Sequence, residues 1–354
     1  MAYTTIDDPS AYFQTVLWTG NGSARSITLD GNSDMQPDWV WLKRRNSARN
    51  HALLDSVRGG TKQLISNSTA AEGTDAQLIT SFDSDGFSLG TSNDCNSSGD
   101  TFVGWNWLAG GTASSNTDGS ITSSVSANTT AGFSIVSWTG NGSNGATIGH
   151  GLGVTPAIVI TKRRSAVGDW LVGGSLIDTV RGGANSLLLL NTTAAMDSNS
   201  EVYQTFSSTT FQVGTNEYAN TSGSTMISYC FAEKKGFSKF GSYTGNGNAD
   251  GTFVYTGFKP AFFICKRYND SGYDWLMYDN KRQVSFNVVD DFLKPNLSDA
   301  ETTGNANQSL EFLCNGVKHR GNGASSNGSG ASYIYMCFAE NPFVTSGGIP
   351  TTAR

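Results

Sequence analysis

Two tryptophans follow an aspartate directly after a glycine-containing loop, at Asp169–Trp170 and Asp274–Trp275. A tryptophan at a loop edge offers a flat apolar face to a sugar ring, while neighbouring Asp, Asn and glycine amides bond its hydroxyl groups. The alternative is that both rings pack between sheets as part of the core. Three further aromatic residues lie in polar, Gly- and Asn-rich surroundings and are the better candidates for exposed contacts: Tyr218, Tyr268 and Tyr273.

Four carboxylates gather in the C-terminal part of the chain, at Asp290, Asp291, Asp299 and Glu301. Two such groups can hydrolyse a glycosidic bond, but a solvated acidic loop is the interpretation that we favour. The stretch Asp83–Gly86 is similar to the start of a calcium loop yet lacks the later ligands, and a hairpin turn explains it. None of the three histidines has a metal-ligating neighbour at helical spacing. The sequence therefore predicts no catalytic residue, no metal and no cofactor.

An Asp is followed three residues later by an Arg at corresponding places along the chain. The stretches read "DSVRGG", "DTVRGG" and, more weakly, "DNKRQV", and the pairs are Asp55/Arg58, Asp178/Arg181 and Asp279/Arg282. Isolated Arg-Gly-Gly motifs also occur in segments that bind RNA. Because each stretch occurs once per corresponding region and always begins with Asp, we interpret all three as turns tied by a structural ion pair.

These stretches belong to a longer pattern that occurs three times in the sequence. Each copy opens on a short phrase: "WTGNGS" at Trp18–Ser23, the same phrase at Trp138–Ser143, and "YTGNGN" at Tyr243–Asn248. We interpret the phrase as a tight turn at the end of a first strand, in which Asn-Gly supplies the positive-φ residues of a hairpin. A ligand-binding loop is the alternative.

Each opening phrase is followed by a proline and an apolar run that ends in basic residues. These runs are Pro37–Arg45, Pro156–Arg164 and Pro260–Tyr268, and the copies close on Phe102–Ala109, Met226–Glu233 and Tyr333–Glu340. The order of segments is kept throughout, which indicates a triplication. The runs are apolar on both strand faces, so we expect them to be covered on both sides.

A unit of this length with short strands and Gly-, Asn- and Asp-rich turns is typical of an antiparallel β-sandwich. The predicted fold is all-β, with three tandem sandwiches of jelly-roll or concanavalin-like type. The expected boundaries are an N-terminal arm 1–12, a first sandwich 13–110, a segment 111–131, a second sandwich 132–236, and a third sandwich with a C-terminal tail 237–354. The segment 111–131, rich in Ser, Thr and Gly, is either a flexible linker or an edge strand.

Composition and charge exclude several classes of protein. The net charge is −6, which argues against nucleic-acid binding. The N-terminus has no pattern of a signal peptide, and no apolar window approaches the roughly 18 residues of a membrane span. Five cysteines without a CxxC pair favour neither zinc nor a disulfide framework. Two of them, Cys230 and Cys337, occupy the same place in their closing segments, which indicates small buried residues.

The pattern "SYTGNG…GF.P.F…KR…WL.YD…FAE.PF" resembles tandem β-sandwich proteins of tailed bacteriophages, especially those that infect marine bacteria. The tail Phe338–Arg354 is particularly similar to the ends of those proteins, and the likeness extends from about Tyr12 to the C-terminus. The resemblance implies a virion structural or tail-fibre protein with a concanavalin-like, jelly-roll-type fold. It brings no set of binding residues with it.

From this resemblance we expect a non-enzymatic virion protein, most readily a tail-fibre subunit that contacts host surface polysaccharide. The alternatives are a capsid decoration or head-fibre protein and, third, a glycan depolymerase. The expected partners are further copies of the chain in a homotrimer and other virion proteins, held by the arm 1–12. We expect localisation to the virion, no membrane insertion, and a third copy that lies outermost.

Overall fold

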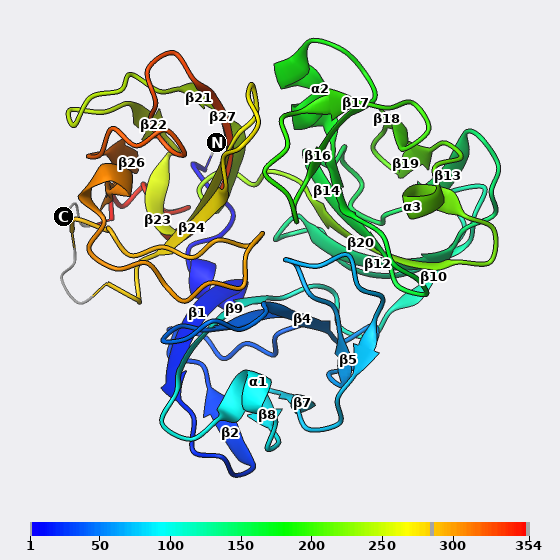
Figure 1. Ribbon diagram of the computed structural model, residues 1–354, viewed down its shortest axis with the longest axis horizontal. Helices are drawn as coiled ribbons and strands as arrows, with labels where there is room; N and C mark the ends of the chain where they lie inside the picture. Colours follow the sequence, from blue (N-terminus) through cyan, green and yellow to red (C-terminus); the bar gives the residue numbers. More distant parts are fainter. Residues whose placement is uncertain (1, 284–286, 352–354) are drawn as a thin grey trace.

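The computed structural model describes residues 2–283 and 287–351, and antiparallel strands with a few short helices make up its regular structure. The prediction of an all-β chain is therefore confirmed. The several antiparallel sheets are consistent with β-sandwich packing. In the arrangement of Figure 1 they form three lobes around a common centre.

The first lobe contains η1 (Pro9–Ala11), β1 (Phe13–Thr19), β2 (Arg25–Thr28), β3 (Trp39–Arg44), β4 (Ala52–Asp55), β5 (Lys62–Gln63), β6 (Gly73–Thr74), β7 (Ile79–Asp83), β8 (Gly86–Leu89), α1 (Asn93–Asn96) and β9 (Thr101–Trp107). The second contains β10 (Ser114–Asn116), β11 (Ser123–Asn128), β12 (Phe133–Thr139), β13 (Ala146–Gly149), β14 (Ile158–Arg163), β15 (Trp170–Gly173), α2 (Ser175–Arg181), β16 (Ser186–Leu189), β17 (Asp197–Ser198), β18 (Tyr203–Phe206), β19 (Thr210–Val213), α3 (Glu217–Asn220) and β20 (Thr225–Phe231). The third contains β21 (Ser238–Thr244), β22 (Phe253–Tyr255), β23 (Phe258–Arg267), β24 (Trp275–Asp279), η2 (Ala306–Gln308), β25 (Leu310–Leu313), β26 (Gly316–His319) and β27 (Ser332–Pro342).

One strand order occurs in every lobe. The inner sheets run β1-β9-β3-β4, β12-β20-β14-β15 and β21-β27-β23-β24, the second being the middle of an eight-stranded sheet. The outer sheets run β2-β8-β7, β13-β19-β18 and β22-β26-β25. Opening and closing strands pair directly in each inner sheet, for example Phe13 opposite Trp107 and Phe133 opposite Phe231.

The central strands of the inner sheets are buried on both faces, as their composition predicts. In β3, Val40 and Leu42 belong to the core inside the first lobe, whereas Trp39 and Trp41 belong to a separate central core. Inner-sheet residues of all three lobes meet in that central core. Because burial of apolar surface stabilises the fold by roughly 25 cal/mol per Å², this shared core fastens the lobes to one another.

The repeated "TGNG" phrase connects the two sheets of a lobe and does not form the predicted hairpin. In the first lobe it leaves β1 in the inner sheet and leads to β2 in the outer sheet. Its second glycine alone takes the positive φ, +71° at Gly22, whereas Asn21 does not. A Cβ atom on its first glycine, Gly20, would lie 2.1 Å from the Ser97 carbonyl oxygen. The phrase recurs because this crossing requires both glycines.

A buried asparagine that the repeat comparison missed holds each crossing. The side chain of Asn220 accepts a hydrogen bond from the Asn141 N–H at 3.0 Å and donates to the carbonyl oxygens of Ser143 and Gly214 at 2.8 and 3.0 Å. The equivalent residues are Asn96 and Asn327, which make the same type of contacts. These residues could have been found from the sequence, because an asparagine stands six residues before the start of each closing segment.

Replacing Asn220 by alanine is expected to lower the free energy of unfolding by about 3 kcal/mol. The substitution removes the side chain that pairs with the Asn141 N–H and the Gly214 carbonyl, at roughly 1–3 kcal/mol for each buried group. Asn144→Ala, which changes an exposed side chain in the same loop, serves as the control with an expected cost of about 0.5 kcal/mol. Urea unfolding of both variants measures the difference. Equal midpoints would contradict a stabilising role for the Asn220 hydrogen bonds.

Several local predictions can be compared with the structure. The segment 111–131 forms β10 and β11, which extend the inner sheet of the second lobe through β12. Hairpins join β7 to β8 and β25 to β26, as the turn residues predict. Cys230 and Cys337 are fully buried free thiols.

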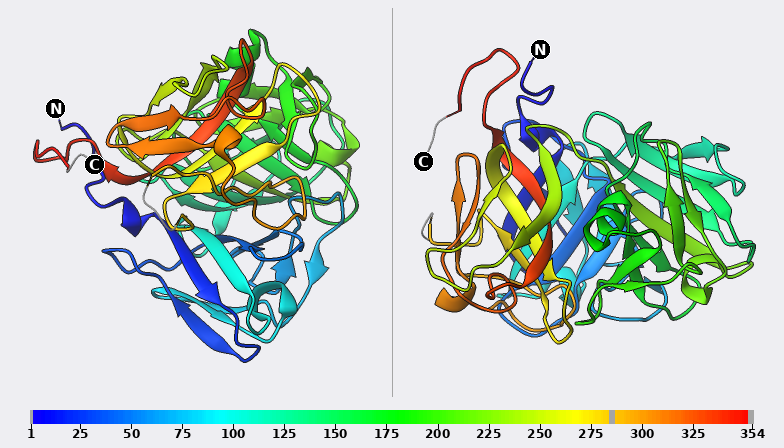
Figure 2. Two further views of the ribbon diagram at one scale, coloured as in Figure 1. Left: turned by 60° about the vertical axis from the view of Figure 1, so that its left-hand side comes forward. Right: turned by 90° about the horizontal axis from the view of Figure 1, so that it is seen from above.

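The described part of the N-terminal arm packs on the third lobe beside the C-terminal tail. Thr4 is buried and donates from Oγ1 to the Lys235 carbonyl at 2.8 Å, and Tyr3 donates from its hydroxyl to the Gly257 carbonyl at 2.7 Å. The Asp7 carboxylate accepts from the Ser346 N–H at 2.6 Å. The first and last described residues therefore lie on one side of the molecule (Figure 2).

Candidate functional site

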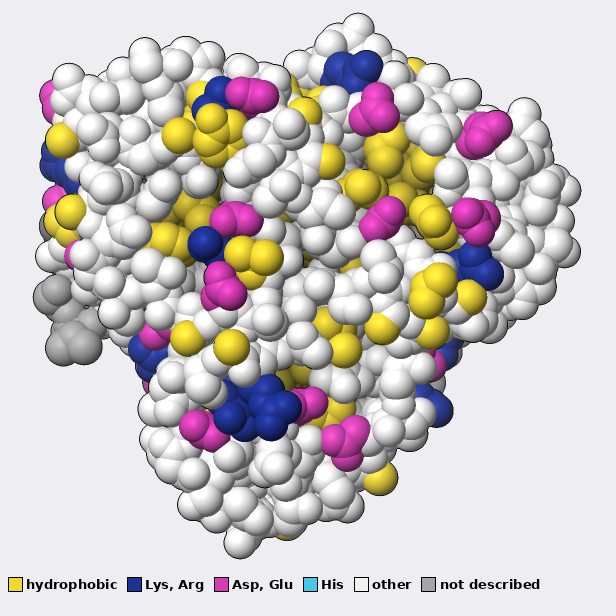
Figure 3. All heavy atoms as spheres, in the orientation of Figure 1, with side chains coloured by type: hydrophobic (Ala, Val, Ile, Leu, Met, Phe, Trp, Pro, Cys, Tyr) yellow, Lys and Arg dark blue, Asp and Glu magenta, His cyan; other side chains and the backbone are white. Residues whose placement is uncertain are grey.

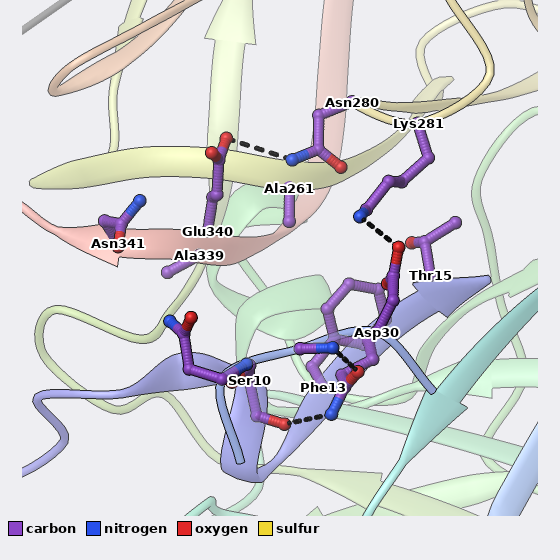
Figure 4. Close-up of a pocket in the computed structure, with 13 residues that line it drawn as sticks. Ser10, Phe13, Thr15, Asp30, Ala261, Asn280, Lys281, Ala339, Glu340 and Asn341 are labelled. Carbon is purple, nitrogen blue, oxygen red and sulfur yellow. Dashed lines mark hydrogen bonds and ion pairs between the residues drawn. The ribbon is translucent and has the colours of Figure 1, made fainter. Parts of the chain in front are cut away.

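A polar hollow of about 320 Å³ opens at the seam between the first and third lobes (Figure 4). We call it the seam pocket. Its first-lobe wall consists of the start of β1 and the turn after β2, and its third-lobe wall of residues beside the ends of β23, β24 and β27. It is lined by Ser10, Phe13, Gln14, Thr15, Asp30, Gly31, Asn32, Ala261, Asn280, Lys281, Ala339, Glu340 and Asn341.

The first-lobe wall is held by the amide of Gln14, a largely buried side chain on β1. Its Oε1 accepts from the Gly31 N–H at 2.7 Å, and its Nε2 donates to the carbonyl oxygens of Ser10 and Ser33 at 2.9 and 3.0 Å. A Cβ atom at Gly31 would lie 2.5 Å from this amide. The turn that carries Asp30 and Asn32 therefore has a fixed position above β1.

The charges of the seam pocket are balanced within its walls. Lys281 and Asp30 form an ion pair of 2.9 Å across the seam. The Glu340 carboxylate pairs with the Lys259 ammonium at 2.7 Å and accepts from the Asn280 amide at 2.9 Å. The remaining lining is mostly amides and hydroxyls, with apolar surface from Phe13 and two alanines. Such a lining suits an uncharged ligand rich in hydroxyl groups.

The two predicted tryptophans lie outside the seam pocket, in the central core. Trp170 and Trp275 are 0% and 3% exposed. Each indole Nε1 donates to a backbone carbonyl of a neighbouring lobe, Trp170 to Ile65 at 2.8 Å and Trp275 to Leu189 at 3.0 Å. Because both rings are buried, neither has a face that a sugar could contact. The two tryptophans are therefore core residues, as the alternative interpretation of the sequence stated, and are not glycan-binding residues.

A third ring makes an equivalent contact that the sequence comparison missed, because it is a histidine. His51 Nδ1 accepts from the Trp41 indole at 3.0 Å, so that Nε2 carries the proton and donates to the Lys294 carbonyl at 3.1 Å. His51 precedes β4 as Trp170 begins β15 and Trp275 begins β24. Each lobe thus inserts one ring into the next around the centre.

The three predicted tyrosines are partly buried and do not converge on the seam pocket. Tyr218 packs against the core of the second lobe, and Tyr268 against the central core. The ring of Tyr273 lies 3.9 Å from the guanidinium carbon of Arg267. These residues remain candidates for surface contacts, but the structure does not bring them together with the groups of the seam pocket.

Two of the three predicted ion pairs form, and they join lobes in addition to closing turns. Arg58 contacts Asp55 at 2.6 Å, and the hydroxyl of Tyr229 from the second lobe donates to the same carboxylate at 2.7 Å. Arg282 contacts Asp279 at 2.5 Å, and Trp105 of the first lobe donates to that carboxylate at 2.9 Å.

The prediction for Asp178 and Arg181 is wrong: no ion pair joins these two described residues. Arg181 is exposed at the end of α2, and the Asp178 carboxylate accepts from the Ser186 N–H at 2.9 Å. Burial raises the pKa of Asp178 above its ordinary value. The strand position of Trp105 and Tyr229 is occupied in the third lobe by Met336. Tyr229 and Trp105 each donate a hydrogen bond to the Asp of a neighbouring lobe. A thioether has no N–H or O–H group, so Met336 cannot donate the corresponding bond to Asp178.

Glu301 is not part of a solvated acidic loop, contrary to the favoured interpretation. Its carboxylate contacts Arg282 at 2.6 Å and Arg45 at 2.8 Å, with 5% of the side chain exposed. Burial raises the pKa of Asp291, which accepts from the Gly304 N–H. No group of three or more His, Cys, Asp or Glu suited to a metal ion occurs among residues 2–283 and 287–351.

The fold and the seam pocket define an all-β protein with a charge-balanced polar hollow between two lobes. The chain belongs to the family described as a domain of unknown function (DUF7483), whose model matches residues 8–342. No curated protein and no solved structure matches the chain. Within the part of the chain described, no helix is long and apolar enough to cross a membrane.

Proposed function

We propose that the chain is a non-enzymatic structural protein of a bacteriophage virion, a tail-fibre subunit that contacts neutral glycans of the host surface. The resemblance of its repeated segments to tail-fibre and virion proteins supports the virion role. The seam pocket carries the glycan proposal, because amides, hydroxyls and paired charges surround a hollow large enough for a sugar ring. On the face in Figure 3, charged side chains are sparse and mixed in sign.

We further propose that the three lobes are tandem copies of one jelly-roll-type β-sandwich. The common strand order of inner and outer sheets supports this proposal, together with the repeated phrases and their order. The expected homotrimer would have to form through outer surfaces of the lobes, because the apolar faces of the inner sheets are buried against one another within one chain.

Attachment to other virion proteins is proposed for the side on which both chain ends lie. The ordered contacts of Tyr3, Thr4 and Asp7 with the third lobe support a fixed attachment surface in place of a loose tether. This arrangement also favours the second candidate, a capsid decoration or head-fibre protein, which would be anchored by the same side. A glycan depolymerase is less well supported, because Glu301 is engaged by two arginines.

Immunogold labelling of intact virions with antibody against this chain tests the virion role. Gold at the tail would support the tail-fibre proposal, and gold over the head would assign the chain to the capsid. Virions without gold, while the antibody detects the free protein, would contradict both.

A glycan array tests the seam pocket. Asn341→Ala removes a pocket amide whose side chain makes no described hydrogen bond, and is expected to weaken binding of a neutral glycan about 5- to 10-fold, as expected for one lost hydrogen bond of about 1 kcal/mol. Asn144→Ala, exposed on the second lobe, is the control and should bind like the wild type. Equal binding by both variants would contradict the location of the site.

A further inference from the structure

A lysine, an asparagine and a glutamate meet in the third lobe beside the seam pocket. One oxygen of the Glu340 carboxylate lies 2.7 Å from the Lys259 ammonium, and the other accepts from the Asn280 amide nitrogen at 2.9 Å. Figure 4 shows the Glu340 carboxylate directed at the Asn280 amide across Ala261. A single carboxylate therefore bridges an amine and a carboxamide that belong to neighbouring strands.

The sheet holds these groups in place. β23, which carries Lys259, lies between β24 and β27 in the inner sheet, and Asn280 directly follows β24. Register shifts on both sides of Pro260 leave Glu340 and Ala261 without opposite residues. The Asn280 N–H donates to the Ala261 carbonyl at 3.0 Å, which fixes the backbone of Asn280 against β23.

Burial limits access of water to the amine. The Lys259 side chain is 5% exposed and that of Glu340 26%. A carboxylate that contacts both reactants can take a proton from the ammonium and deliver it to a leaving nitrogen, which is the role of a positioned general base and acid. Holding the amine and the amide in one fixed arrangement replaces the encounter of two free groups.

We propose that Lys259 and Asn280 form an intramolecular isopeptide bond, with Glu340 as the proton carrier. Glu340 takes a proton from the Lys259 ammonium, and the neutral Nζ attacks Cγ of Asn280. The new Nζ–Cγ bond forms while the Cγ–Nδ2 bond breaks. Glu340 delivers the first proton from Nζ to Nδ2, which leaves as ammonia, and the second proton that Nζ loses on becoming an amide passes through Glu340 to that ammonia, which is released as ammonium. The step needs no oxidant, reductant or cofactor, and the chain loses one ammonia.

The other lobes do not carry this set of residues. At the strand position of Glu340 the second lobe has Glu233, whose carboxylate contacts Lys239 at 2.7 Å with both side chains 38% exposed. No asparagine or glutamine amide bonds to Glu233 among the described residues. The proposed bond is thus specific to the third lobe, the lobe on which both chain ends pack, where a covalent link between β23 and the end of β24 would resist separation of the strands.

Intact-mass spectrometry of the purified full-length chain tests the proposal. The wild type should be lighter than its sequence requires by one ammonia, about 17 Da. Glu340→Gln and Lys259→Arg should both retain the full mass, whereas the matched control Glu233→Gln should lose ammonia like the wild type. Lys259→Arg keeps a positive charge beside Glu340, so that retention of the full mass by a folded variant reports the missing amine.

A proteolytic map identifies the bond. The expected product is a branched tryptic peptide that joins the segment containing Lys259 to the segment containing Asn280. A wild-type chain of full mass would overturn the proposal. So would a loss of ammonia that persists in Lys259→Arg, because that result would assign the loss to another asparagine, for example through cyclisation onto its own backbone.

Discussion

Arg58→Ala is expected to lower the free energy of unfolding by about 3–5 kcal/mol, the cost of removing one partner from a buried ion pair. The substitution leaves the fully buried Asp55 carboxylate without its cation. It also removes a 3.0 Å contact with Glu72, which Arg164 of the second lobe holds from the other side at 2.8 Å. Burial opposes ionisation of Glu72, but the two arginines hold its pKa below the ordinary value.

The chain contains a matched control for this prediction. Arg181 stands in the same Val-Arg-Gly-Gly context as Arg58 but is exposed at the end of α2. Arg181→Ala should change the free energy of unfolding by less than about 0.5 kcal/mol, as is usual for a surface position. Urea unfolding followed by tryptophan fluorescence compares the variants. A similar small effect of both substitutions would show that the Arg58 contacts do not fasten the first lobe to the second.

Acidification is expected to destabilise the protein from about pH 6.5 downward, because all three histidines are buried in their neutral form. Burial lowers the pKa of His319 to about 3 and that of His51 well below its ordinary value. Burial also lowers the pKa of His150. The Nδ1 atoms of His51 and His150 accept hydrogen bonds, from Trp41 and from the Leu152 N–H, and protonation would break both.

The direction in which stability changes with pH follows from proton binding to the folded and unfolded chains. Below pH 6.5 the unfolded chain binds a proton at each histidine that the folded chain does not bind until the pH reaches the lowered pKa. The stability is therefore complete above the unfolded pKa and falls with pH below it, by about 1.4 kcal/mol per pH unit for each histidine.

His319→Phe isolates one of these contributions. The ring of His319 stacks on Tyr243 at 4.9 Å, and neither of its nitrogens has a hydrogen-bond partner, so an apolar ring can replace it. Between pH 6 and pH 4 the variant should gain about 3 kcal/mol of stability relative to the wild type. Urea unfolding at several pH values measures this difference. Parallel curves for the two proteins over that range would contradict the prediction.

The class of fold could be predicted from the sequence because its signals are local. Turn residues such as Asp85–Gly86 and runs such as Pro37–Arg45 report the conformation and the two-sided burial of their own segments. The glycines of "TGNG" could be predicted to form a turn, but its route between two sheets could not, because that depends on Asn96, far along the chain.

The seam pocket could not be found from the sequence, since its walls come from opposite ends of the chain. The same reason explains the wrong expectation for exposed tryptophans. An Asp-Trp pair after a glycine-containing loop has the same letters whether the ring faces solvent or a neighbouring lobe, and only the packing of the lobes buries Trp170 and Trp275.

The two Val-Arg-Gly-Gly stretches show which properties depend on local sequence and which depend on contacts between lobes. That an Asp and an Arg stand three residues apart beside a turn can be read from the printed residues alone, since spacing along the chain is local information. Whether the arginine is buried and paired, as Arg58 is, or exposed, as Arg181 is, depends on how the lobes pack. The neighbouring lobe makes the difference, because Tyr229 donates its hydroxyl to the Asp55 carboxylate, whereas Met336 at the equivalent strand position has no N–H or O–H group to donate.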